Sequence, residues 1–293
     1  MHIRISRGRK VFLILNTIIT LLIALICLAP MIHILALSLS GKNAVVSGSV
    51  GFWPVDITLD SYRYVMDDPQ FFRAFGVSVL RTVLALVIQM VMTILAAYPL
   101  SMRKQKFRAR SFYVWLLMIT MLFSGGLIPT YLVVSKAGLM NSIWALLLPT
   151  AVPVYHVILL QNFIKALPDE ISEAAAIDGA GHFQTLLRVI LPLCKASLAT
   201  LCLFVAVNNW NAWFDGMIYI DDNTRFPLQT YLRTIIIDVN TAMMSDMRSL
   251  AQQVASTGAD SAKILISMIP ILMVYPFLQK HFVKGIVHGS VKE

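Results

Sequence analysis

The sequence predicts an all-α membrane protein with six transmembrane helices, and three observations lead to this fold class. Of the 293 residues, 58% are hydrophobic and 13% are charged, whereas soluble domains carry about 25% charged residues. The mean hydropathy is +0.74. Six stretches reach the roughly 20 predominantly apolar residues that a helix needs to cross a bilayer, where each backbone polar group must be satisfied within the segment.

The first predicted span follows the basic segment RISRGRK. Its apolar run is too long for a cleaved signal peptide, and no small-x-small cleavage site follows, so we expect an uncleaved anchor. In the third span, Gly125, Gly126 and Pro129 predict a break or hinge. The six spans cover residues 11–37, 75–100, 111–134, 142–163, 192–214 and 262–278. The three cysteines fall within these spans, and their spacing predicts neither a disulfide framework nor a metal site.

The distribution of lysine and arginine predicts the orientation, because cations are retained in the cytoplasm. The N-terminus, the second connection and the C-terminus are basic, whereas the first and fifth connections are acidic on balance. An even number of helices with both termini in the cytoplasm accounts for this pattern. The net charge of +9 is therefore attributed to topology and to contact with membrane lipid rather than to nucleic-acid binding.

The expected organisation places one anchor helix before a core domain. The segments are a cytoplasmic N-terminus (1–10), the anchor helix (11–37), an extracytoplasmic segment (38–70), a core domain with helices 2–6 (71–280) that contains a cytoplasmic loop (164–191) and an extracytoplasmic loop (218–261), and a cytoplasmic C-terminal tail (281–293).

The cytoplasmic loop contains the segment PDEISEAAAIDGAGHFQTLLRVILPL. Pro168 and the two acids that follow it suit the start of a helix, and Gly179 can end that helix by adopting a positive φ. A second helix is expected to place Phe183, Leu186, Leu187 and Ile190 on one apolar, interfacial face. The first helix is too small to be stable alone, so it needs a groove, either on a partner protein or among the chain's own helix ends.

The segment EAAAIDGA, followed by an apolar helix and ILPL, resembles the EAA loop of permeases from binding-protein-dependent ABC importers. FSGGLIPTYLVVSKAGLMNSIWALLLPTAVPVYHVILLQNF, NNWNAWFDGMIY, FPLQTYLR and PILMVYPFLQKHFVKGIVHGSVKE are similar to the carbohydrate branch, in the subgroup that includes permeases for maltose-like and alginate-like oligosaccharides. The resemblance runs from about Arg7 to Glu293. It departs from the family pattern at Leu186, where an aromatic residue is common, and at Gly181, which is often serine.

The resemblance implies that the loop carries a coupling helix, which docks into a cleft on a cytoplasmic ATPase. The implied contact residues are Glu173, Ala174, Ala175, Asp178 and Gly179. The implied assembly, in the bacterial inner membrane, adds a second related permease subunit, two ATPase subunits and an extracytoplasmic solute-binding protein, with two different permeases favoured in the carbohydrate branch. ATP and Mg²⁺ would bind the partner ATPase, and this chain would bind no cofactor.

The residues themselves favour an external energy source. No acid lies between Asp68 and Asp169, so a coupling proton or ion lacks a carboxylate in three spans. The chain also lacks the Gly-x-x-x-x-Gly-Lys-Ser/Thr loop that cradles phosphates, so a nucleotide would bind another polypeptide. An ion-coupled secondary transporter and a non-transporting membrane scaffold remain as alternatives. No His-Glu-x-x-His or Gly-x-Ser-x-Gly pattern supports an intramembrane enzyme.

The segment VNNWNAWFDG is the richest in polar and aromatic residues within a span. Asn208 and Asn209 can hydrogen-bond to hydroxyls, and Trp213 offers a flat face to a sugar ring. On a continuous helix Asn209 and Trp213 share a face, so we expect them first along a substrate path, with Tyr131 as a further candidate. Alternatively, the asparagines join helices and the tryptophans form an interfacial belt.

Arg81 has two interpretations. It is either a cation that favours acidic sugars or, as we expect, a side chain that snorkels to the lipid surface near a helix end.

Overall fold

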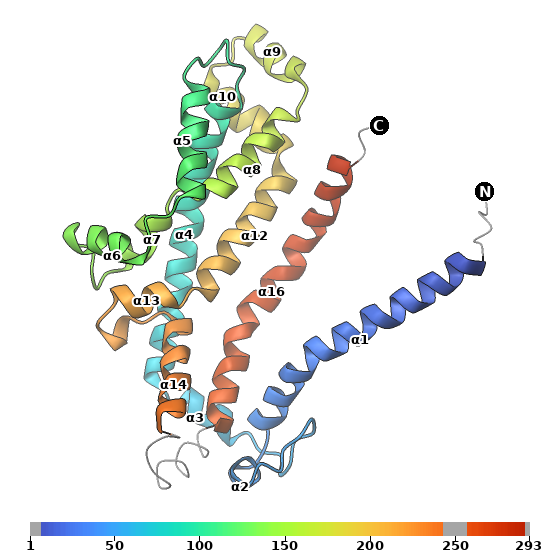
Figure 1. Ribbon diagram of the computed structural model, residues 1–293, viewed down its shortest axis with the longest axis vertical. Helices are drawn as coiled ribbons and strands as arrows, with labels where there is room; N and C mark the ends of the chain where they lie inside the picture. The colour runs from blue at the N-terminus through green and yellow to red at the C-terminus, as the bar shows by residue number, and fades with distance from the viewer. Residues whose placement is uncertain (1–6, 243–256, 291–293) are drawn as a thin grey trace. The chain divides into compact units, whose positions relative to one another are not determined.

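The structure, a computed structural model, describes residues 7–242 and 257–290. Within these ranges every regular element is a helix, which confirms the all-α fold class (Figure 1). Parts of three predicted segments lie outside the described residues: 1–6 of the N-terminus, 243–256 of the loop 218–261, and 291–293 of the tail.

The helices follow one another with short connections. They are α1 (Arg7–Ser38), α2 (Lys42–Val46), α3 (Asp60–Met66), α4 (Pro69–Ser101), α5 (Arg110–Leu122), α6 (Leu127–Lys136), α7 (Ile143–Leu147), the 3₁₀ turn η1 (Leu148–Thr150), α8 (Val154–Lys165), α9 (Asp169–Ile177), α10 (His182–Thr185), the π turn η2 (Leu186–Ile190), α11 (Leu191–Leu193), α12 (Lys195–Asn211), α13 (Phe214–Tyr219), the 3₁₀ turn η3 (Asn223–Arg225), α14 (Leu228–Ala242) and α16 (Thr257–Ser290).

Between three and six of these segments can cross a membrane, judged by length and composition. Three single helices qualify: Gly8–Ser38, Pro69–Ser101 and Thr257–Val274. Three more spans each require a pair of helices joined at a sharp bend, and the angles are 113° for α5 and α6, 45° for α7–η1 and α8, and 84° for α10–α11 and α12. The six predicted stretches coincide with these three continuous and three broken segments.

The predicted break in the third span is confirmed. Helix α5 ends at Leu122 and α6 begins at Leu127, and Figure 1 shows α6 lying across the end of α5. Gly126 has φ +87° and ψ 177°, a conformation that residues with a Cβ rarely adopt. The hydroxyl of Thr130 then donates to the Gly126 carbonyl at 2.8 Å, which satisfies one polar group that the break exposes.

The described residues fall into two compact units. The first contains the chain up to Phe71 together with the described part of Thr234–Met268. Its small core combines Ala36 from α1 with Ala44, Val45 and Val50. The Ser40 hydroxyl donates to the Ala36 carbonyl at 2.6 Å, so the end of α1 is fixed to the segment that follows it.

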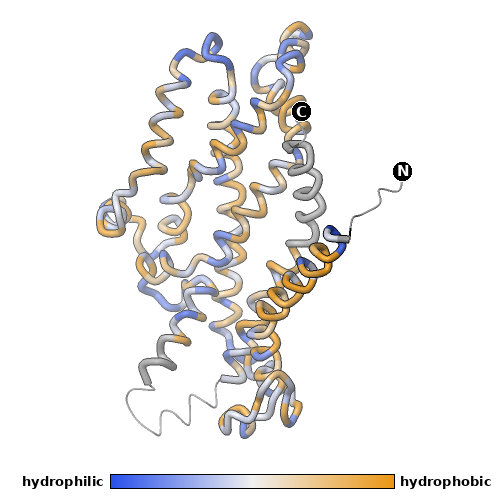
Figure 2. The backbone as a smooth tube through the Cα atoms, turned by 45° about the vertical axis from the view of Figure 1, so that its right-hand side comes forward, coloured by the Kyte–Doolittle hydropathy of each residue, from blue (hydrophilic) through white to orange (hydrophobic). Residues whose placement is uncertain are grey.

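A buried ion pair also holds the first unit together. The ammonium group of Lys263, from α16, lies 2.8 Å from the Asp68 carboxylate, and the lysine is 5% exposed. The rest of α1 has apolar side chains exposed on all sides, and Figure 2 shows hydrophobic residues along most of its length. A helix that is apolar all round requires a nonpolar environment, so α1 suits a membrane anchor.

The second unit contains Phe72–Arg233 together with the described part of Ile269–Glu293. Its main core lies among α4, α8, α12 and the turn η2. The fully buried members include Ala97, Leu160, Leu201 and Val205. This core joins the segment around α9 and η2 to the long helices, so a displacement of one is transmitted to the others by direct packing.

We expect Gly126→Ala to destabilise the protein by about 1–3 kcal/mol, because alanine is strained at that positive φ. Thermal unfolding of the detergent-purified protein measures the effect. Gly125→Ala is the matched control, since a Cβ there meets only ordinary contact with Pro129 at 3.9 Å. Equal unfolding temperatures for the two variants would contradict the role of Gly126 in the bend.

Candidate functional site

The alanine-rich helix forms where the sequence predicts it and ends at the predicted glycine. Helix α9 runs from Asp169 to Ile177, and Gly179 follows with φ +76°. The Gly179 N–H donates to the Ala176 carbonyl at 3.1 Å, and the Ala180 N–H donates to the Ala175 carbonyl at 2.9 Å. These two bonds make a Schellman motif, which satisfies the last carbonyls of the helix. The connector, residues 164–191, therefore contains a helix with a fixed C-terminus.

The coupling residues divide between two faces of α9. Ala175 is 8% exposed and packs inward, whereas Glu173, Ala174 and Asp178 are exposed. Ile177, which the sequence reasoning did not select, is 86% exposed beside Asp178. An isoleucine four residues after Glu173 on a helix was the available signal. The outward face is thus small, acidic and marked by one large apolar side chain.

Arg103, from the connection between α4 and α5, holds the connector helix from the side. Its guanidinium donates to the Asp169 carboxylate and lies 3.7 Å from the Glu173 carboxylate. The hydrogen bond and the charge of Asp169 raise the pKa of Arg103, and the charge of Glu173 adds to this shift. All three side chains are more than half exposed, so the contact orients the helix and contributes little stability.

The second helix of the connector differs from the prediction. Leu186 and Ile190 are buried in the main core, but Phe183 and Leu187 are 67% and 47% exposed, so the expected single apolar face is wrong. The physical reason is the π turn η2, in which the Leu191 N–H donates to the Leu186 carbonyl. A wider turn rotates the side chains away from α-helical spacing.

The four path candidates do not lie on one helical surface. Helix α12 ends at Asn211, Ala212 is extended, and Trp213 is the N-cap of α13, so the expected shared face of Asn209 and Trp213 does not form. Asn209 is buried and its side-chain amide donates to the Val205 carbonyl at 2.9 Å, within its own helix. Asn208 is exposed.

The two aromatic candidates are each partly exposed and each lie against a neighbour. The Arg233 guanidinium lies 5.0 Å from the centre of the Trp213 ring. Tyr131, on α6, stacks on Tyr219 of α13 with ring centres 6.4 Å apart. Both tryptophan and tyrosine are about one-third exposed, which leaves part of each ring available to a ligand.

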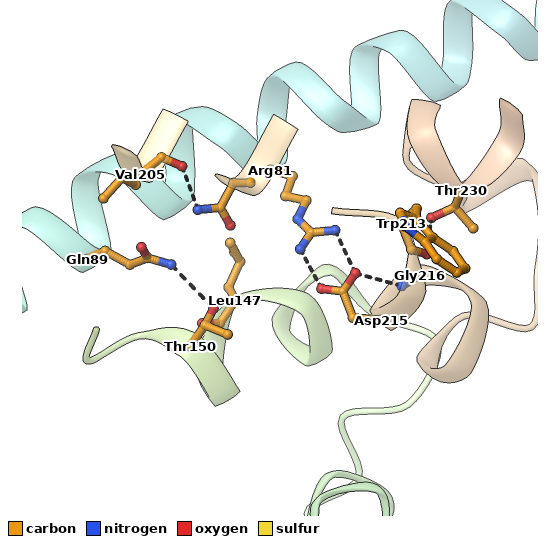
Figure 3. A network of polar contacts seen from close by, with 10 residues as sticks. Arg81, Gln89, Leu147, Thr150, Val205, Trp213, Asp215, Gly216 and Thr230 are labelled. Carbon is orange, nitrogen blue, oxygen red and sulfur yellow. Dashed lines mark hydrogen bonds and ion pairs between the residues drawn. The ribbon is translucent and has the colours of Figure 1, made fainter. Parts of the chain in front are cut away.

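Arg81 is buried and paired, so the expectation that it snorkels to the lipid surface is wrong. It is 2% exposed, and its guanidinium forms a bidentate contact with the Asp215 carboxylate, with one N–O distance of 3.1 Å (Figure 3). Asp215 also accepts the Gly216 N–H at 2.9 Å. The carboxylate thereby neutralises Arg81 and begins α13 at the same time.

Close packing secures α13 on its other side. The Thr230 hydroxyl, from α14, donates to the Trp213 carbonyl at 2.8 Å (Figure 3). A Cβ at Gly216 would lie 2.1 Å from that hydroxyl oxygen, so only glycine fits there. The Leu228 N–H donates to the Ser78 hydroxyl of α4 at 2.7 Å. Helices α4, α13 and α14 therefore form one hydrogen-bonded cluster.

Helix α4 presents a buried polar seam at intervals of three or four residues, and sequence reasoning missed it. The seam consists of Ser78, Arg81, Ala85, Gln89, Thr93 and Ala97, all at most 5% exposed. The Gln89 amide donates to the Thr150 hydroxyl at 3.3 Å (Figure 3). Polar and small residues on one face of an apolar helix are typical of helix contacts inside a membrane, and this spacing was the signal.

Residues 74–288 match the family described as "Binding-protein-dependent transport system inner membrane component". The chain is 39% identical over 289 residues to Protein LplC of Bacillus subtilis (strain 168), covering 98% of this chain and 97% of that protein. It is 39% identical over 274 residues to the polygalacturonan/rhamnogalacturonan transport system permease protein YtcP of the same organism, covering 93% and 95%.

One solved structure is similar over nearly the whole chain. It is the crystal structure of a bacterial ABC transporter involved in the import of the acidic polysaccharide alginate. The TM-score is 0.85 at 31% sequence identity, and the match covers 95% of this chain and 99% of that one.

We expect Asp215→Ala to destabilise the protein by about 3–5 kcal/mol, because it leaves the Arg81 guanidinium buried without a counter-charge. The double variant Arg81→Met/Asp215→Ala is expected to recover most of that loss. Both are measured by thermal unfolding in detergent. A double variant no more stable than Asp215→Ala would contradict the assignment of the loss to an uncompensated charge.

Proposed function

The chain belongs to the family of inner membrane components of binding-protein-dependent transport systems, and from this premise we propose that it forms part of the translocation path for an oligosaccharide or a related polar solute. The chain is a transport subunit rather than an enzyme. The observation that carries the proposal is the similarity, over at least 93% of this chain, to a permease and a transporter whose names specify polysaccharides. The carbohydrate resemblance in the sequence is thereby confirmed.

In the proposed assembly, the connector lies in the cytoplasm and docks on a partner ATPase. The excess of lysine and arginine at the N-terminus, around Arg103 and at the C-terminus supports cytoplasmic termini and a cytoplasmic connector. The outward face of α9 supports docking, because Ala174 allows close backbone approach, Ile177 fills an apolar pocket, and Asp178 pairs with a cation. Ala175 and Gly179 shape the helix from within.

The packing of the connector suggests how force reaches the path. Binding of ATP by the partner subunits closes them and moves α9 with them. Leu186 and Ile190 are buried in the same core as α4, α8 and α12, so these long helices follow the movement. The path then alternates between the two sides of the membrane, and solute delivered by an extracytoplasmic binding protein enters from outside.

The path itself is proposed to use aromatic faces more than buried amides. Trp213 and Tyr131 keep part of their rings exposed, and such rings stack on the apolar faces of sugars. Asn208 is exposed and free to bond a hydroxyl, whereas Asn209 has its amide engaged by its own helix. A second permease subunit supplies the other half of the path, and ATP with Mg²⁺ binds the two ATPase subunits.

We expect Ile177→Asp to abolish co-purification with the ATPase, since replacement of an anchor in a small interface costs about 2 kcal/mol or more. Ile57→Asp is the matched control, because Ile57 is 75% exposed in the segment 38–70, on the opposite side of the membrane. Gly179→Pro and Glu173→Arg are expected to act as Ile177→Asp does. Intact association in all three connector variants, with normal membrane insertion, would refute the docking assignment.

The solute is tested by ATP hydrolysis in the reconstituted complex with its binding protein. We expect one class among neutral and uronic oligosaccharides to stimulate hydrolysis several-fold, and Trp213→Ala to reduce this stimulation while basal hydrolysis persists. Uptake that continues without ATP and follows a proton or sodium gradient would favour the ion-coupled alternative. A complex that no solute stimulates would favour a scaffold.

A further inference from the structure

A cavity of about 650 Å³ lies within the second unit, between the connector and the ends of the long helices. Its wall is formed by the C-terminal end of α4, the connection to α5, the end of α8, and helices α9 and α10. It is separate from the seam around Arg81 and Asp215, and the outward residue Ile177 is not part of its wall.

The wall of the cavity carries more positive than negative charge. Four cations line it: Arg103, Lys106, Arg110 and Lys165. The two carboxylates in the wall, Asp169 and Glu173, both contact Arg103. Among the residues that the structure describes, no carboxylate lies within ion-pair distance of the other three cations. Like charges around one cavity repel, so an anion in the cavity would be stabilised.

Neutral hydrogen-bonding groups complete the wall. The Tyr98 hydroxyl lies 3.4 Å from Nδ1 of His182, and their rings meet edge to face. Both groups can donate to an oxygen atom as well as to each other. A ligand with several acceptor oxygens therefore suits the cavity better than a simple halide ion.

The cavity also lies at the ends of candidate membrane spans. Helix α4 ends at Ser101, α5 begins at Arg110, α8 ends at Lys165, and the third bent pair begins at His182. The ends of spans lie at the boundary between lipid and water, where phosphate groups of lipids are located. Directly after Arg110, α5 exposes the apolar side chains of Phe112 and Trp115, which provide a surface for acyl chains.

We propose that this cavity binds the phosphate group of an anionic membrane lipid, held by Lys106, Arg110 and Lys165. Lysine and arginine are the usual partners of phosphate oxygens, through charge-assisted hydrogen bonds. A bound phosphate removes the repulsion among these cations and ties α5 and α8 together beneath α9. The connector then rests on a base that depends on the lipid composition of the membrane.

The test compares two double variants of the complete, delipidated complex in detergent. Arg110→Gln/Lys165→Gln removes two cations from the cavity. Lys104→Gln/Arg108→Gln removes the same charge from the same connection, at residues outside the cavity wall. Native mass spectrometry during titration with phosphatidylglycerol measures binding, with phosphatidylcholine as the zwitterionic reference.

We expect the cavity variant to weaken phosphatidylglycerol binding by about thirtyfold, from the contribution of two surface cations. The control variant is expected to change it by less than about threefold. An equal loss in the two variants, or none in the cavity variant, would overturn the proposal. Unchanged unfolding temperatures establish that the variants fold.

A second arm separates lipid from free phosphate. Millimolar inorganic phosphate alone is expected to bind far more weakly than phosphatidylglycerol, because it lacks the acyl chains that contact α5. Tight binding of inorganic phosphate, with no preference for the lipid, would overturn the assignment to a membrane lipid.

Discussion

A chain that occupies a bilayer must satisfy its polar groups internally, and most features of this structure follow from that constraint. The helices break at three places, and at the sharpest break the Thr130 hydroxyl bonds the carbonyl of Gly126. A guanidinium inside the helix cluster requires a carboxylate, which Asp215 provides. The same carboxylate accepts the Gly216 N–H, so one charge satisfies two requirements.

The connector obeys a different constraint, because it lies at the ends of the spans and few of its residues are buried. Its shape is fixed by local bonds, the Schellman motif at Gly179 and the contact of Arg103 with Asp169. Its mechanical link to the long helices is apolar, through Leu186 and Ile190. Rigidity and transmission are thus provided by separate sets of residues, which leaves the outward face free to match a partner.

Much of this architecture is readable from the sequence because it depends on local composition. Apolar runs locate all six candidate spans, and Gly125–Gly126 locates the break in the third. The alanine-rich helix and its terminating glycine follow from capping rules. The pair between Arg81 and Asp215 could not be predicted, since 134 residues separate them and their proximity depends on tertiary packing. The end of α12 at Asn211 was also missed, because the sequence there contains neither proline nor a positive-φ glycine.

The position of Arg103 between two carboxylates has a consequence for how a partner engages and leaves the connector. When a partner's cation takes Glu173, Arg103 retains Asp169, so the start of α9 stays tethered. When the partner withdraws, Glu173 regains the guanidinium and no charge is left without a counter-ion. Attachment and release become an exchange between near-equal states, which suits a joint that must be made and broken in every transport cycle.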